Sequence, residues 1–216
     1  ELGGTGGMGR VLGKELAGGG DEVLVTTRYA GNKQEKDGDN ISYIQGNAHD
    51  DGFLKTLMRE RWNAVVDFMA YSTDEFKHRY RFLLDNTGHY IFLSSARVYA
   101  DSETPITEES PRLLDVCRDA RYLATDEYAL AKARQENLLR SSGYKNWTIV
   151  RPYITYSDER LQLGVFEKEN WLYRALQGRT IVFPKDIAEH YTTMTYGGDV
   201  AKGIAMLAGN DKAKAQ

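Results

Sequence analysis

The chain has 216 residues, enough for one large domain or for one domain and part of a second. Its formal net charge of -3 gives no electrostatic reason to expect a nucleic-acid or membrane-surface partner. The single cysteine, Cys117, excludes an internal disulfide, and we expect a reducing, cytoplasmic location. No apolar run approaches the ~18 residues that a membrane span needs, so we expect no membrane partner.

A glycine-rich segment lies at the start of the chain. It reads Gly3-Gly4-Thr5-Gly6-Gly7-Met8-Gly9, and a helical pattern follows it directly as far as the glycines at 18–20. A glycine turn that opens a helix lets the backbone approach a diphosphate, and the helix N-terminus supplies free N–H groups and a positive dipole end. Glycines also form ordinary loops, so this pattern alone leaves both interpretations open.

Short apolar runs alternate with amphipathic segments along the chain. The apolar runs are rich in β-branched residues and predict strands at 23–26, 41–44, 64–69, 90–93 and 147–150. Helices are predicted between them, one burying Phe53, Leu54, Leu57 and Met58 and another burying Phe76, Tyr80, Leu83 and Leu84 with Thr73 as N-cap. This alternation predicts an α/β fold with a doubly wound parallel sheet.

Two segments of the chain depart from this alternation. Only Glu1 and Leu2 precede the glycine turn, so we expect the natural protein to have further strand residues before them. The polar stretch 31–40 is expected to be a solvated loop.

Tyr128 and Lys132 lie four residues apart in a segment predicted to be helical from about 125 to 140. Residues at this spacing share one helix face, so the ammonium can stabilise a phenolate. A tyrosine supported in this way can exchange a proton with a substrate hydroxyl. The same spacing joins Tyr29 to Lys33 in a polar segment, where we interpret it as coincidence, and a simple surface helix would also explain Tyr128 and Lys132.

Hydroxyl residues follow the strand predicted at 90–93, in the sequence Leu93-Ser94-Ser95-Ala96-Arg97-Val98-Tyr99. The carboxyl edge of a parallel sheet is where such folds bind ligands. A Ser-Ser pair after a strand is otherwise a common turn or capping element.

Taken together, these motifs resemble the extended short-chain dehydrogenase/reductases, in particular the NAD(P)-dependent sugar epimerase/dehydratase branch. The resemblance covers nearly the whole chain and rests on six segments in the family's order: the glycine loop, Phe68-Met69-Ala70-Tyr71, the Ser94–Tyr99 motif, the Tyr128/Lys132 pair, Arg151-Pro152-Tyr153 and Gly198-Asp199-Val200-Ala201. It implies a Rossmann domain at 1–152, substrate-lobe segments at 153–198 that look incomplete, and a late helix at 199–216 that packs back on the domain.

The resemblance also implies a role for each matching residue. Ser95 would hydrogen-bond the reacting oxygen, Tyr128 would be the acid/base, and Lys132 would hold the nicotinamide ribose and stabilise the phenolate. Cofactor contacts would come from the glycine loop, the segment near adenine, the apolar-alanine motif and the proline motif: Gly3, Thr5, Gly6, Gly7, Met8, Gly9, Asn47, Ala48, Met69, Ala70, Tyr71 and Pro152. A homodimer, paired through the helix that carries Tyr128, is expected by resemblance only.

The choice between NAD and NADP is predicted from the end of the strand at 23–26, which is the second strand of the expected fold when the strand before the glycine turn is counted. An acidic residue there binds the ribose hydroxyls of NAD, whereas an arginine accommodates the extra phosphate of NADP. That region reads Thr26-Thr27-Arg28, with Lys33 further along, so NADP is favoured and NAD is less favoured.

The chain departs from the resemblance at the substrate side. Thr192 stands where nucleotide-sugar enzymes often carry an arginine, and Arg160, Arg179 or Lys185 could serve instead. The four histidines show no metal-ligand spacing, so no metal site is predicted.

These features favour an enzyme that oxidises a sugar or nucleotide sugar and then epimerises, dehydrates or reduces the product. Two alternatives stay open. One is an NADPH-dependent reductase of a small carbonyl or aromatic metabolite, and the other is a non-catalytic NADP-binding regulator on the same fold.

Overall fold

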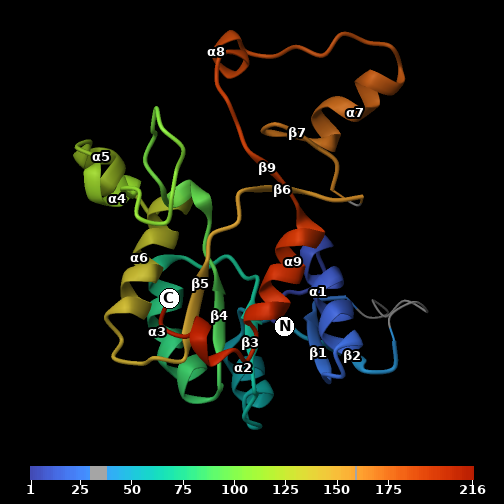
Figure 1. Ribbon diagram of the computed structural model, residues 1–216, viewed down its shortest axis with the longest axis vertical. Coiled ribbons are helices and arrows are strands. Elements are labelled where there is room, and N and C mark those ends of the chain that lie inside the picture. Colours follow the sequence, from blue (N-terminus) through green and yellow to red (C-terminus); the bar gives the residue numbers. More distant parts are fainter. Residues whose placement is uncertain (30–37, 159) are drawn as a thin grey trace.

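The computed structural model describes residues 1–29, 38–158 and 160–216. A parallel sheet forms the centre of the molecule (Figure 1). β1 (Val23–Thr27) pairs with β2 (Ile41–Gln45), and β3 (Val65–Asp67), β4 (Tyr90–Leu93) and β5 (Trp147–Val150) pair side by side. All five predicted strands are therefore present.

The first two residues join these two groups of strands. The N–H of Leu2 donates to the Val66 carbonyl at 2.9 Å, and the N–H of Thr26 donates to the Glu1 carbonyl at 3.0 Å. Residues 1 and 2 thus lie between β1 and β3, which gives the order β2, β1, residues 1–2, β3, β4, β5. This is the doubly wound parallel arrangement that the sequence predicts.

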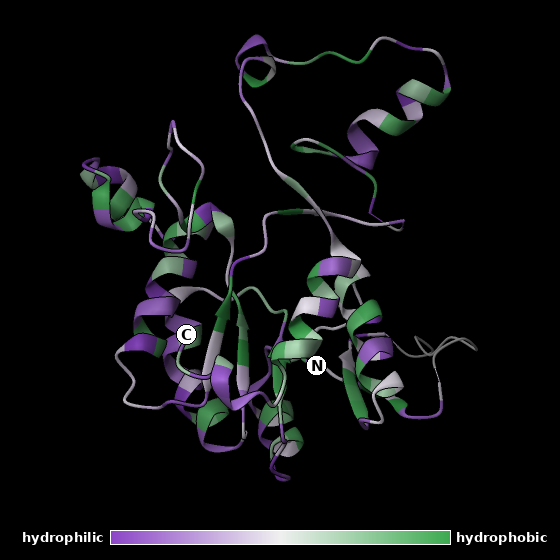
Figure 2. Ribbon diagram, in the orientation of Figure 1, coloured by the Kyte–Doolittle hydropathy of each residue, from purple (hydrophilic) through white to green (hydrophobic). Residues whose placement is uncertain are grey.

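Helices cover both faces of the sheet because successive strand residues point to opposite sides. Tyr90 and Phe92 of β4 pack under α2 (Asp51–Leu57), α3 (Thr73–Asp85) and α6 (Tyr128–Arg140). Ile91 and Leu93 pack under α1 (Gly7–Gly18) and α9 (Gly197–Leu207). Figure 2 shows β4 as apolar and the helices as alternating apolar and polar bands, as expected for helices with one buried face.

Helix boundaries follow the sequence signals, with three corrections. α6 begins at Tyr128 and not at about 125, and the late helix α9 spans Gly197–Leu207 and not 199–216. The N-cap of α3 is Ser72 and not Thr73, because the Ser72 hydroxyl accepts from the N–H of Glu75 and the Glu75 carboxylate accepts from the N–H of Ser72. This reciprocal pair satisfies two N–H groups that a helix start leaves unpaired. α1 ends at Gly18 with Gly19 as its C-cap, as the glycine run predicts.

Residues 153–196 form a smaller, more open lobe above the sheet (Figure 1). β6 (Ile154–Tyr156) pairs with β9 (Met194–Tyr196) in parallel, and β7 (Gln162–Leu163) pairs with β8 (Phe166–Glu167) as a hairpin. The lobe also contains α7 (Lys168–Leu176) and α8 (Lys185–Ala188). The predicted domain boundaries at 152 and 198 stay a prediction.

Short elements complete the chain. η1 (Ala96–Val98) follows β4, and α4 (Leu113–Val116) and α5 (Ala120–Leu123) precede α6. η2 (Asp211–Ala213) leads to the C-terminus, where Ala215 and Gln216 hydrogen-bond to β5. Within the described ranges, no helix has the length and apolar character needed to cross a membrane.

Candidate active site

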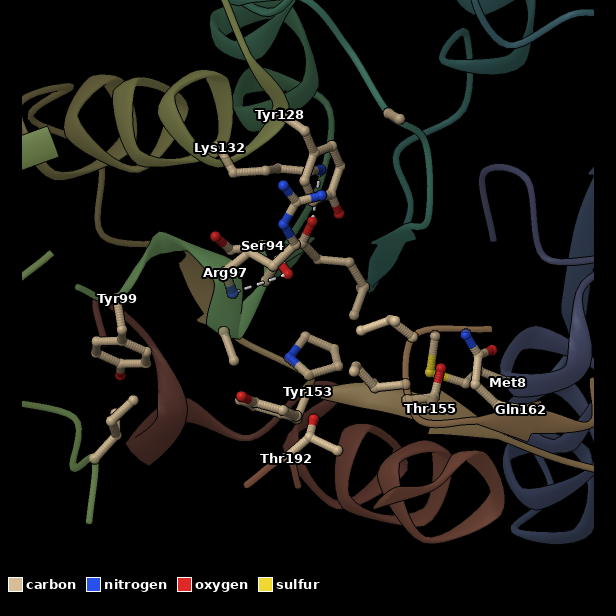
Figure 3. A pocket seen from close by; sticks show the side chains of 18 of the residues that line it. Met8, Ser94, Arg97, Tyr99, Tyr128, Lys132, Tyr153, Thr155, Gln162 and Thr192 are labelled. Carbon is tan, nitrogen blue, oxygen red and sulfur yellow. Dashed lines mark hydrogen bonds between the residues drawn. The ribbon is translucent and has the colours of Figure 1, made fainter. Parts of the chain in front are cut away.

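A cavity of about 820 Å³ opens between the carboxyl edge of the sheet and the lobe. Its wall contains seven of the sequence-predicted site residues: Met8, Met69, Ala70, Ser95, Tyr128, Lys132 and Pro152. They come from five separate segments of the chain. Figure 3 shows Tyr128 and Lys132 together at one side of this cavity and Met8 at another.

The three predicted catalytic side chains occupy different depths in the wall. Tyr128 is the first residue of α6 and is 40% exposed. Lys132, one turn further along, is 2% exposed, and its Nζ lies 6.0 Å from the centre of the Tyr128 ring. Ser95 caps η1, since its hydroxyl accepts from the N–H of Arg97 at 3.2 Å.

Two carbonyl groups hold Lys132 in place. Its Nζ donates to the Leu93 carbonyl at 2.7 Å and to the Met69 carbonyl at 3.3 Å. Burial lowers the pKa of Lys132 to about 8, although the negative charges of Asp67 and Glu136 oppose that shift. The ammonium has a third N–H, and its Nζ also lies 4.5 Å from the centre of the Phe92 ring.

Behind this wall lies a buried ionic cluster that motif spacing did not predict. Glu136 is 0% exposed, and Arg151 reaches it through two N–H groups at 2.7 and 2.8 Å. Arg112 donates to the same carboxylate at 3.2 Å, and the Ser94 hydroxyl donates to it at 2.6 Å. Burial acts to raise the pKa of Glu136, but the hydrogen bonds from Arg151 and Ser94 outweigh it, so the pKa lies below its usual value.

The adjacent serines Ser94 and Ser95 have different surroundings, because only Ser94 belongs to the cluster. Ser94 is bound to Glu136 and is 4% exposed, whereas the Ser95 side chain is half-buried in the cavity wall. Glu136 lies one helical turn beyond Lys132, so the same four-residue spacing that linked Tyr128 to Lys132 was the signal that could have revealed it.

The glycine loop fits a diphosphate by its shape. A Cβ at Gly9 would come within 2.3 Å of the Gly4 carbonyl oxygen, so the loop folds against α1 with no room for a side chain. Gly3 has a φ of +72°, which glycine adopts without strain. A Cβ at Gly6 would meet nothing within 4 Å and no side chain caps α1, while the Ser157 hydroxyl lies 2.6 Å from where a Cβ of Gly7 would stand. The start of α1 is therefore open beside Gly6, where a helix N-terminus can bind an anion.

The remaining predicted cofactor residues lie outside the cavity wall. Gly3, Thr5, Gly6, Gly7 and Gly9 form the loop and the start of α1, beside Met8. Arg28 is exposed just after β1, with its guanidinium 5.8 Å from the Tyr29 ring centre, and Asn47 is exposed after β2. Lys33 and most of the 31–40 loop lie outside the described residues.

Two of the predicted residues are buried in the core. Ala48 is 3% exposed and Tyr71 is 5% exposed, and the Tyr71 hydroxyl donates to Asp67 at 3.4 Å. In this structure their side chains contribute to packing under α3.

The lobe supplies the other side of the cavity. Thr155, Arg160, Gln162, Val165 and Thr192 line it, whereas Arg179 and Lys185 do not. The guanidinium of Arg160 is paired with the carboxylate of Glu167.

A family model described as NAD(P)H-binding matches residues 3–181 of this sequence. The chain belongs to the NAD(P)H-binding family. The prediction of an NAD(P)-binding Rossmann protein is thereby confirmed. No curated protein matches the sequence.

Solved structures with the same fold include several epimerases. An epimerase from Methanothermobacter thermautotrophicus is 20% identical with a TM-score of 0.76, over 99% of this chain and 68% of that one. The Bordetella bronchiseptica enzyme WbmH, solved with NAD+, is 18% identical with a TM-score of 0.68, over 95% and 70% of the two chains. A UDP-galactose 4-epimerase is 18% identical with a TM-score of 0.68, over 96% and 70%.

At these identities the likeness shows a shared fold. The structural neighbours of this NAD(P)H-binding protein include epimerases and an enzyme solved with NAD+, which agrees with the resemblance seen in its motifs.

Proposed function

We propose that this protein is an NADP-dependent oxidoreductase of the epimerase/dehydratase type, acting on a sugar or nucleotide sugar with Tyr128 as the acid/base. The observation that carries the proposal is the shared cavity wall of Ser95, Tyr128 and Lys132. Met69, Ala70 and Pro152 provide an adjoining apolar surface suited to a flat nicotinamide ring.

Each of the three polar residues has a distinct task in this proposal. Tyr128, exposed to the cavity, takes the proton of the substrate hydroxyl. Ser95 hydrogen-bonds the same oxygen, and Lys132 donates to the nicotinamide ribose while its charge stabilises the phenolate of Tyr128. The bound cofactor supplies hydride transfer at its nicotinamide ring.

We further propose that the glycine loop holds the diphosphate and that Arg28 favours NADP. Arg28 is exposed at the end of β1, where the adenosine ribose lies in folds of this kind. Thr26 and Thr27, which precede it, carry no acidic group for the ribose hydroxyls of NAD.

One observation favours a second candidate, an NADPH-dependent reductase of a smaller carbonyl compound. Thr192 and the apolar residues Ile106 and Val165 line the cavity, and these side chains have no special affinity for a diphosphate. In that case the reduced cofactor would be consumed, whereas an epimerase returns the hydride to its substrate.

The test is Tyr128→Phe, measured as hydride transfer with a panel of UDP-sugars and small ketones. We expect the variant to lose at least ~100-fold in turnover, because the proton acceptor is gone. Its dissociation constant for NADP should stay within about twofold of the wild type, since only the phenol oxygen is removed. Unchanged turnover would refute the proposed role of Tyr128, and net loss of NADPH during turnover would identify the reductase.

A further inference from the structure

Arg97 is the second residue of η1, and its side chain reaches from β4 across to the start of α6. Its guanidinium carbon lies 5.5 Å from the centre of the Tyr128 ring, and its Nη2 donates to the Glu127 carboxylate at 2.7 Å. Figure 3 shows Arg97 beside Tyr128 in the cavity. The side chain is 64% exposed and forms part of the cavity wall.

The guanidinium is held in place with donors to spare. Glu127 and the Tyr128 ring fix one edge and one face of the group. Within the described part of the chain, Nε and Nη1 of Arg97 have no partner. A guanidinium fixed in this way loses little conformational entropy when its remaining N–H groups bind a carboxylate or phosphate.

The charges around the cavity also favour an anion. Its wall contains three cationic side chains, Arg97, Lys132 and Arg160, but Asp101 is its one carboxylate among the residues described. The carboxylates that pair with the two arginines, Glu127 and Glu167, are not part of the wall. The wall itself therefore carries more cationic than acidic side chains, and carboxylates outside it pair with Arg97 and Arg160.

We propose that Arg97 determines substrate specificity by binding a carboxylate or phosphate carried close to the hydroxyl that faces Tyr128. The inference rests on the proposed function, because it takes Tyr128 as the reacting end of the cavity. It narrows the substrate class to acidic or phosphorylated polyols and sugars. Arg97 would contact the substrate and leave the cofactor untouched.

The test measures binding to the NADP-loaded protein without turnover. D-glucuronate and D-glucose 6-phosphate carry the two kinds of anion, and D-glucose is the neutral reference. The readout is the Nε–H signal of Arg97 in heteronuclear NMR, identified by its absence in Arg97→Met. We expect saturable shifts with at least one anion, binding that is ~10-fold tighter than that of glucose, and loss of this preference in Arg97→Met.

Two further variants separate anion binding from a structural effect. Arg97→Lys keeps the charge without the planar fork and should retain part of the preference. Arg81→Met removes an arginine that lies 5.4 Å from the Tyr80 ring outside the cavity, so it should leave binding unchanged. A shift with one anion only identifies which group the substrate carries.

Equal affinity for glucose and both anions, absence of any saturable shift, or a preference that survives Arg97→Met would overturn the proposal. Because no turnover is measured, these outcomes are independent of the Tyr128→Phe assay.

Discussion

At the scale of single residues, the candidate site contains a lysine that is buried and hydrogen-bonded to two backbone carbonyls. A neutral amine has two N–H groups, and the carbonyls of Met69 and Leu93 would occupy both. In the proposed function a third donor contacts the cofactor, and this donor exists only while Lys132 is protonated. Because burial lowers the pKa of Lys132 to about 8, this donor is lost in mildly alkaline solution.

We therefore predict that affinity for NADP falls as the pH rises through about 8. The sign follows from the lowered pKa: below it Lys132 is an ammonium with a free donor, and above it the donor is gone. Fluorescence titration of NADPH between about pH 7 and pH 9 measures the effect. Lys132→Met should bind more weakly and show no such dependence, and a wild-type affinity that stays constant over this range would contradict the prediction.

At the scale of elements, the Glu136 cluster joins three segments whose ends form the cavity wall. Glu136 belongs to α6, Ser94 follows β4, and Arg151 follows β5. A buried carboxylate with two arginine partners fixes the relative positions of these elements. Removing one partner of such a group leaves uncompensated charge in the interior.

We predict that Glu136→Gln lowers the free energy of unfolding by about 3 kcal/mol. Asp115→Asn is the matched control, because Asp115 pairs with the same Arg112 but its side chain is 49% exposed. Exposed pairs contribute about 0–1 kcal/mol, so the control should change little. Urea unfolding measures both, and equal effects would show that burial of the carboxylate does not matter.

The strands and most helices were predictable because their signals are local. Apolar β-branched runs gave all five strands of the sheet, and the spacing of Phe76, Tyr80, Leu83 and Leu84 gave the buried face of α3. Thr73 was a plausible N-cap by type, but the cap is chosen by the partner three residues later, and Glu75 selects Ser72.

The partners of the site residues were less predictable. Arg97 meets Glu127 from 30 positions away, and Glu136 meets Arg151 across two elements. Such pairs depend on the tertiary arrangement, so the spacing that singles out Glu136 on its helix does not indicate its arginine partners.

At the scale of the whole molecule, the C-terminal segment is attached to the sheet through a buried histidine. The N–H of Gly209 donates to Nδ1 of His89 at 3.2 Å, so Nε2 carries the proton and faces the Thr148 hydroxyl at 2.7 Å. Thr148 in turn donates to the Ala213 carbonyl at 2.5 Å. If Nδ1 were protonated, its N–H would face the N–H of Gly209, and neither donor would have an acceptor.

We predict that stability falls as the pH drops below about 6.5, the pKa of an unfolded histidine. Burial, the largest cause, lowers the pKa of His89 in the folded protein, so the unfolded chain binds the extra proton first. The slope attributable to His89 should approach about 1.4 kcal/mol per pH unit at most. Thermal unfolding of His89→Gln should lack this component, whereas His78→Gln, at an exposed site, should keep it; identical slopes in all three proteins would rule it out.

The residues of the cavity wall come from two parts of the chain, the domain around the sheet and the lobe. Ser95, Tyr128 and Lys132 come from strand ends and a helix that are tied into the core, whereas Gln162, Val165 and Thr192 come from the open lobe. Substitutions in the second group leave the hydrophobic core of the sheet intact. Directed evolution of new substrate preferences can therefore concentrate on the lobe and leave the three proposed proton-transfer residues beneath it unchanged.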